Sequence, residues 1–352
     1  MSCASGSRCG CYIAVPIDAA AAMQLALDQD DAWRRTRLAL PATPARVVID
    51  TDAANEIDDQ FALAWALLSP AQLRVEAVYA TPFSFAHRRH LIDRELRDPR
   101  PFAAPGLGMQ RSYAEIERIF ALLGISSAAR VFRGAIDYLA STGAPVASAA
   151  TQDLVQRAMA TAESAPPLYV LALGCPTNIA NALLIEPRIA QRIVVVWTSG
   201  FPSHAPQPNH SFNLEQDVVA TRVLLDSGVP LVYLPGYHVG AQLRISLPEM
   251  ERWVQPMGAI GAYLHQLFTH NPLWELQGIT SFFAHSWVMW DLICIAWMLQ
   301  PDWVPSELVR TPRLSDDKRW LAASARPLMR EAYAVRRDAV FADFLGKLRG
   351  AC

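Results

Sequence analysis

The sequence has very little lysine, no long apolar run and no Cys-x-x-Cys motif. Lysine occurs only as Lys318 and Lys347. No apolar stretch reaches the roughly 18 residues that a membrane span needs, and the first residues lack the basic and apolar regions of a secretory signal. We therefore expect a cytoplasmic protein that has no membrane partner.

The six cysteines form no Cys-x-x-Cys motif and show no Cys/His spacing typical of a metal site. Free thiols in a reducing compartment are the simplest interpretation, in place of a disulfide framework. The net charge is −2 and 18% of the residues are charged, so we expect no nucleic-acid surface. A small molecule is the expected partner.

With 352 residues, of which 52% are hydrophobic, the chain can bury a full core. We interpret residues 1–44 as an N-terminal extension and residues 45–350 as a single catalytic domain. In that domain strand and helix patterns alternate, which predicts an α/β fold with a doubly wound, mostly parallel sheet and helical insertions near the active site. The expected strands are 47–49, 75–79, 168–173, 193–197 and 231–233, and the expected helices are 60–68, 112–123, 151–163, 178–184 and 217–227.

The densest chemical signal follows the first expected strand. Five carboxylates come within ten residues, at Asp50, Asp52, Glu56, Asp58 and Asp59. Carboxylates so close together raise one another's pKa, so their ionised forms are costly unless a cation neutralises them. Oxygen ligands favour a hard ion, Ca²⁺ or Mg²⁺. The alternative is a solvated turn in which Asp58 or Asp59 caps the next helix.

Three later regions have a distinctive composition. Residues 81–108 are polar and proline-rich and follow an expected strand, which fits either a lid or a solvated surface loop. Residues 197–210 are also proline-rich, and we interpret them as a second loop over the site. Residues 246–287 show a helical, aromatic pattern, and we expect most of these aromatic side chains in the core.

Four motifs occur in order along the chain. They are Asp50-Thr51-Asp52 with Asp58-Asp59, the turn Gly174-Cys175-Pro176-Thr177-Asn178-Ile179-Ala180 after a strand, Phe212-Asn213, and Trp290-Asp291-Leu292. Together they resemble the calcium-dependent, inosine/uridine-preferring nucleoside N-ribohydrolases. The resemblance implies a nucleoside hydrolase fold and a Ca²⁺-dependent enzyme that cleaves a ribonucleoside, or a related N-ribosyl compound, to ribose and free base.

The resemblance also implies roles for individual residues. The expected Ca²⁺ ligands are Asp52, Asp59, Asp291 and the backbone carbonyl of Leu173, with Asp50 supporting the cluster from behind. Asp52 would also take the proton of the attacking water, while Asp58 and Asn213 would contact the ribose. Our candidate for protonating the leaving base is His285 or, alternatively, a histidine of the possible lid at residues 81–108.

The chain departs from the family pattern at several substrate-contacting positions. The loop after Asp52 is two residues longer than usual, so Asn55 or Glu56 can enter the site. Ser211 stands where the family has Glu, and Trp290 stands where base-specific members often have His.

These departures motivate an alternative, a catalytically impaired Ca²⁺-dependent sugar or nucleoside binding protein of the same fold. A haloacid-dehalogenase-like phosphatase would also begin with Asp-x-Asp, but it needs a later lysine, and lysine is nearly absent. The aromatic second half and the resemblance together predict a homodimer or homotetramer.

Overall fold

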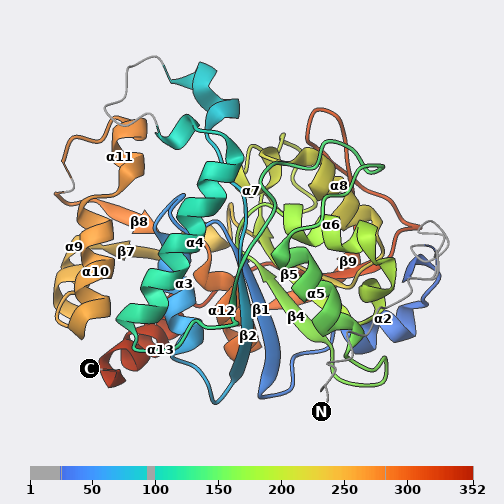
Figure 1. Ribbon diagram of the computed structural model, residues 1–352, viewed down its shortest axis with the longest axis horizontal. Helices are drawn as coiled ribbons and strands as arrows, with labels where there is room; N and C mark the ends of the chain where they lie inside the picture. Colours follow the sequence, from blue (N-terminus) through green and yellow to red (C-terminus); the bar gives the residue numbers. More distant parts are fainter. Residues whose placement is uncertain (1–23, 25, 93–99, 282, 352) are drawn as a thin grey trace, which may run out of the picture.

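The computed structural model describes residues 24, 26–92, 100–281 and 283–351. Within them, eight strands form one sheet in the spatial order β3–β2–β1–β4–β5–β6–β12–β9 (Figure 1). In that order the strands are β3 (Val131–Arg133), β2 (Leu73–Ala80), β1 (Ala45–Thr51), β4 (Leu168–Ala172), β5 (Ile193–Ser199), β6 (Leu231–Pro235), β12 (Leu328–Ala332) and β9 (Ser306–Arg310). All neighbours pair in parallel except β9, which is antiparallel to β12. The predicted doubly wound, mostly parallel sheet is confirmed.

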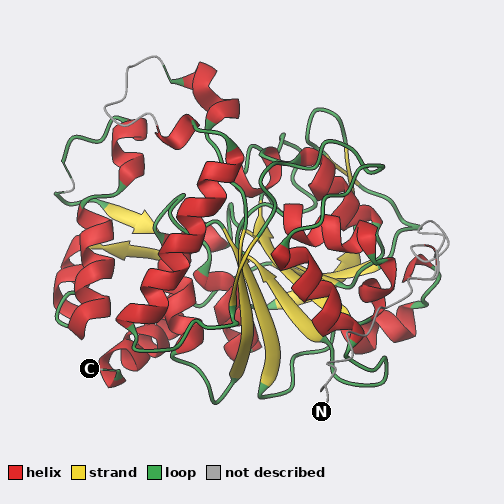
Figure 2. Ribbon diagram, viewed as in Figure 1, coloured by secondary structure: helices red, strands yellow, loops and turns green. Residues whose placement is uncertain are grey.

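Helices cover both faces of the sheet (Figure 2). One face carries α3 (Asp58–Leu67), α4 (Pro105–Leu122), α12 (Leu292–Leu299) and α13 (Arg337–Gly350), and the other carries α2 (Asp31–Arg37), α5 (Ala149–Met159), α6 (Thr177–Ile185) and α8 (Val218–Asp226). Successive side chains of β1 pack alternately into the two helical layers, since Val47 and Ile49 belong to one apolar core and Val48 to the other. This alternation explains why both strand faces are apolar.

Smaller elements surround this sandwich. β7 (Arg244–Ser246) and β8 (Ser286–Val288) form an antiparallel pair, and β10 (Arg313–Leu314) pairs with β11 (Trp320–Leu321). The remaining helices are η1 (Ala86–Leu91), η2 (Arg100–Phe102), η3 (Pro187–Gln191), α7 (Phe212–Glu215), η4 (Gly240–Gln242), α9 (Leu247–Glu249), the π-helix η5 (Met250–Val254), α10 (Gly258–Thr269), α11 (Pro272–Gln277) and η6 (Pro301–Trp303). None of the helices in the described ranges is long and apolar enough to cross a membrane.

The expected strands and helices are all present, with different ends. Helix α4 begins at Pro105 rather than Ser112, because proline fits the first turn of a helix, where no N–H bond is lost. Helix α3 begins with Asp58 and Asp59 inside its first turn, and its N-cap is Ile57 without a side-chain bond. The alternative in which either aspartate caps this helix is therefore wrong.

The aromatic region 246–287 is only partly as expected. Phe268 and Trp274 are buried, but Trp287 lies in strand β8 rather than in a helix, and Trp253 and Phe283 are exposed. Phe282 lies outside the described residues, as do residues 1–23 of the expected extension and residues 93–99 of the expected lid. From the extension, Arg34 of α2 donates to the carbonyl oxygen of Gly228, which lies between α8 and β6, and to that of Ala26.

The order of the strands fixes where a ligand can bind. After β1 the chain builds β2 on one side, whereas β4 pairs with β1 on the other side. The carboxyl ends of β1 and β4 thus flank a topological switch point, and open α/β sheets bind ligands in the crevice there. Asp50 and Asp52 lie at the end of β1, and Leu173 directly follows β4.

Candidate active site

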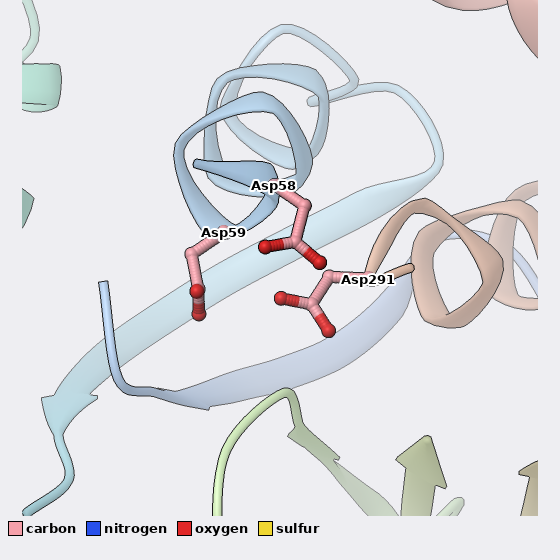
Figure 3. A group of neighbouring side chains, drawn as sticks. All are labelled: Asp58, Asp59 and Asp291. Atoms are coloured by element: carbon pink, nitrogen blue, oxygen red, sulfur yellow. The ribbon is translucent and has the colours of Figure 1, made fainter. Parts of the chain in front are cut away.

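Three aspartates from two helices meet at this switch point. Asp58 and Asp59 start α3, and Asp291 is the N-cap of α12. Figure 3 shows the three side chains pointing toward one another. Each offers a carboxylate oxygen within 4.8 Å of the others, and all three are buried. Because helix N-termini carry partial positive charge, they favour these anionic groups.

Hydrogen bonds hold the neighbouring acids in place. Thr51 donates its hydroxyl to Asp59, and the Asn55 side-chain amide donates to Asp52 Oδ2 over 3.0 Å. Asn178, from the turn that begins α6, donates to Asp50 Oδ1 over 2.8 Å. The other Asp50 oxygen has no hydrogen-bond partner among the described residues although it is buried. Asn178, in the motif after β4, therefore orients Asp50, the acid that precedes the cluster.

The burial of so many acids strongly disfavours their charged forms. Burial raises the pKa of Asp50 to about 7. Burial raises the pKa of Asp59 to about 6, although Thr51 and Asp291 hydrogen bonds oppose the shift. The pKa values of Asp52, Asp58 and Asp291 lie well above the ordinary range, first because of burial and then because of neighbouring carboxylates. A bound cation would remove this cost.

The acids line one wall of a cavity of about 330 Å³. Asp52, Asp58, Asp59, Asp291, Leu173 and Asn213 all reach it, together with Asn55, Glu56, Ser211 and Trp290. Apolar side chains form much of the remainder, including Phe85, Phe212, Tyr237 and Leu276. A cavity with a polar wall and mostly apolar remaining walls is typical of a small-molecule site. The structure thus brings together nearly all the residues that the sequence analysis selected, the exceptions being Asp50 and His285.

Asn213 lies on α7 beside the end of β4. Its amide donates to the carbonyl oxygens of Leu173 and Thr198, the latter over 3.2 Å. The Ser211 hydroxyl is bonded to that of Ser199 over 2.8 Å. The amide oxygen of Asn213 is thereby aimed away from these carbonyls, while the Ser211 hydroxyl already has a protein partner.

His285 lies apart from this wall. Its ring packs 6.0 Å from that of Trp274, and no histidine of the described chain lines the cavity. The assignment of His285 to the leaving base stays a prediction that this geometry does not support.

Sequence reasoning missed Arg88 and Tyr237. Arg88, on η1 in the expected lid, lines the cavity and donates to Glu215 over 3.1 Å and to the carbonyl oxygen of His210. Tyr237 follows β6, and its ring stands edge-on to Trp290 at 5.9 Å. The only signal for Tyr237 was its place after a strand end, which many residues share.

Comparison with known proteins agrees with this geometry. The model of the family described as inosine-uridine preferring nucleoside hydrolase matches residues 47–336, which is most of the chain. The chain belongs to this nucleoside hydrolase family. The predicted family is therefore confirmed.

Individual relatives of this chain are distant. It is 28% identical over 145 residues to the pyrimidine-specific ribonucleoside hydrolase RihA of Citrobacter koseri, a match that covers 40% of the chain and 45% of the relative. The chain thus matches about half the length of such curated relatives.

Solved structures match over more of the chain. A purine-preferring ribonucleoside hydrolase from Gardnerella vaginalis superposes with a TM-score of 0.66 at 16% identity, covering 87% of this chain and 98% of that one. The type III effector protein XopQ, in complex with adenosine diphosphate ribose, superposes with a TM-score of 0.58 at 16% identity, covering 95% and 98%. At these identities the likeness concerns the fold alone.

The donor set of this site fits a hard metal ion. The family is metal-dependent, and the acids Asp58, Asp59 and Asp291 present only oxygen atoms. Zinc favours nitrogen and sulfur ligands, which the described cavity wall does not offer, whereas Ca²⁺ and Mg²⁺ favour carboxylates and carbonyls. Asp52 and Leu173 line the same cavity and could add further oxygen atoms.

Proposed function

We propose that the protein is a Ca²⁺-dependent hydrolase that cleaves the N-glycosidic bond of a ribonucleoside or related N-ribosyl compound to ribose and free base. The observation that carries the proposal is the buried acidic cluster, which faces a cavity of about 330 Å³ at the switch point of the sheet. The chain spans only part of its curated relatives, so this activity rests on the site itself.

The proposed Ca²⁺ ligands are Asp52, Asp59, Asp291 and the carbonyl of Leu173. Asp58 lies within the same cluster and is proposed to accept a hydrogen bond from a ribose hydroxyl. Bound there, Ca²⁺ would orient the ribose diol and lower the pKa of a water molecule. Ca²⁺ is preferred to Mg²⁺ because it accepts more oxygen ligands in irregular geometry.

Each side chain has its own role in the proposed reaction. Asp52, held by Asn55, takes the proton of the attacking water. As the bond to the base breaks, positive charge grows on the sugar ring, and the amide oxygen of Asn213 and the neighbouring carboxylates stabilise it. Phe85, Phe212, Tyr237 and Trp290 offer apolar and ring surfaces for the base.

The test is release of free ribose by the purified protein from purine, pyrimidine and nicotinamide ribosides, with Ca²⁺, with Mg²⁺ and with chelator. We expect release that Ca²⁺ supports and chelator abolishes. Asp52→Ala should remove both turnover and tight Ca²⁺ binding. Asp302→Ala, which changes an exposed acid outside the cavity, should leave both intact.

The second candidate is a Ca²⁺-dependent binding protein of the same fold. The engaged hydroxyl of Ser211 and the absence of histidine from the described cavity wall favour it. No ribose release from any riboside, with Ca²⁺ binding retained in calorimetry, would reject the hydrolase and support this candidate.

A further inference from the structure

Glu56 reaches the cavity because of the unusual course of the loop between β1 and α3. Ala54 adopts a left-handed backbone with φ of 74°, and the Asn55 backbone N–H donates to the Asp52 carbonyl oxygen over 2.9 Å. Ile57 is fully buried on the far side of the turn. With Asn55 turned back onto Asp52 and Ile57 anchored in the core, the side chain of Glu56 lines the cavity.

Two tryptophans hold the carboxylate in that position. The Trp287 indole N–H donates to Glu56 Oε1 over 2.9 Å, and Trp290 also stabilises the carboxylate by a hydrogen bond. Trp287 lies on β8, far along the chain, and is itself buried. Because Trp287 is a rigid ring in packed surroundings, its indole pre-organises Glu56.

The contacts of Glu56 within the protein do not use all of its hydrogen-bond acceptor positions. A carboxylate offers about four acceptor positions, and the two indoles use only a part of them. Among the described residues Glu56 forms no salt bridge, and the nearby Arg88 is bonded to Glu215 instead. Burial raises the pKa of Glu56 to about 7, and the nearby Asp59 adds to this shift. A neutral amide would accept an indole N–H without the cost of burying a carboxyl group, so the indole contacts alone do not account for a glutamate at this position of the cavity wall.

We propose that Glu56 is a substrate-contacting residue that accepts a hydrogen bond from an N–H or O–H group of the riboside lying outside the diol bound by the acidic cluster. This inference rests on the proposed function. The donor is either an N–H of the base or the 5′-hydroxyl of the ribose, which share this chemistry. Ser211 lines the same cavity but bonds to Ser199, so it does not supply such a charged acceptor.

The experiment compares wild type with Glu56→Gln, which keeps the shape and removes the charge. Three ribosides of the base class that the wild type accepts are used: the parent nucleoside, its 5′-deoxy analogue and its N-methyl analogue (1-methylinosine or 3-methyluridine). The readouts are kcat and KM from release of the free sugar (ribose, or 5-deoxyribose from the 5′-deoxy analogue), and affinity from calorimetry with Ca²⁺. The control variant is Glu251→Gln, which changes an exposed carboxylate on η5.

A hydrogen bond to a charged group predicts a loss in kcat/KM and affinity of roughly ten- to a hundredfold for the parent nucleoside. The loss should shrink below about twofold for the analogue that lacks the donor. Loss of the effect with the 5′-deoxy compound identifies the sugar hydroxyl, and loss with the N-methyl compound identifies the base. Trp287→Phe, which frees the carboxylate, should give a smaller loss with the same substrate dependence.

Two outcomes overturn the inference: an equal loss for all three ribosides, which marks a structural role, or no loss for any. Failure of the proposed function gives a different result, because the wild type would then bind ribosides without releasing ribose. In that case the calorimetric affinities of wild type and Glu56→Gln still decide the role of Glu56. A wild type that binds none of the three ribosides would overturn both.

Discussion

At the scale of single residues, Asp59 shows how a site is assembled at the expense of stability. Its carboxylate is buried beside Asp58 and Asp291, and Thr51 is the hydroxyl donor that holds it. An unfolded aspartate ionises near its ordinary pKa, but burial raises the pKa of folded Asp59 to about 6. The metal-free protein therefore loses stability from this residue as the pH rises from about 4 to about 6.

Asp59→Asn should consequently stabilise the metal-free protein at pH 7.5, by on the order of 1–3 kcal/mol in the free energy of unfolding. It should also abolish the stabilisation that Ca²⁺ gives to the wild type, because the cage loses a charged ligand. Chemical denaturation with chelator and with Ca²⁺ measures both effects. A variant that is less stable than wild type in chelator would contradict the interpretation of Asp59 as a costly ligand.

At the scale of elements, Glu215 joins three segments, one of which carries the cavity residue Arg88. It accepts hydrogen bonds from Arg88 on η1, from Lys318 in the turn between β10 and β11, and from His210 ahead of α7. Burial opposes its ionisation, yet Lys318, His210 and Arg88 lower its pKa to about 2. One carboxylate on α7 thus holds the described part of the expected lid to the body of the protein.

Glu215→Gln should lower the free energy of unfolding by about 1–2 kcal/mol at pH 7, after allowance for solvent screening. A lowered pKa contributes stability above the ordinary glutamate value, and this contribution is lost as the pH falls from about 4.5 to about 2. The difference between wild type and variant should therefore vanish near pH 2. Denaturation curves across this range test it, with Glu307→Gln on the exposed edge of β9 as control. A difference that does not change with pH would contradict the ion-pair explanation.

At the scale of the whole molecule, the second half of the chain presents large apolar side chains to solvent. Trp253 is 46% exposed and Phe283 is 83% exposed, whereas most other aromatic side chains of this region are shielded. Both lie in the part that contains α9 to α11, beside the β7–β8 pair. Exposed aromatic groups of this size commonly mark protein contacts.

We propose that the protein forms a homodimer or homotetramer, in which these side chains contribute to the interface. Light scattering on a sizing column should give a multiple of 38.8 kDa. Phe283→Ser or Trp253→Ser should shift the mass toward the monomer. The control Leu40→Ser, which changes an exposed side chain near the start of the chain, should not. A wild type that is monomeric at all concentrations would reject this proposal.

The sequence by itself determined the local pattern of this protein. Val47–Ile49 is apolar on both faces, so it indicated a buried parallel strand, and the acids that follow it indicated a cation site at that strand's end. The resemblance at the Thr177-Asn178 turn implied a second strand end near the site. The strand prediction is confirmed because backbone hydrogen bonding and burial set periods of a few residues, which a short stretch of sequence shows, whereas the cation site stays a prediction.

Only the tertiary structure decided which distant residues meet. It brought Asp291 to Asp58 and Asp59, joined Arg88 and Lys318 to Glu215, set Trp287 beside Glu56, and placed His285 away from the cavity. It also inserted β12 between β6 and β9. Such contacts depend on how loops close and helices pack, and many pairings would satisfy the same local pattern. The sequence therefore predicted the acidic cluster at the end of β1, and the fold decided what surrounds it.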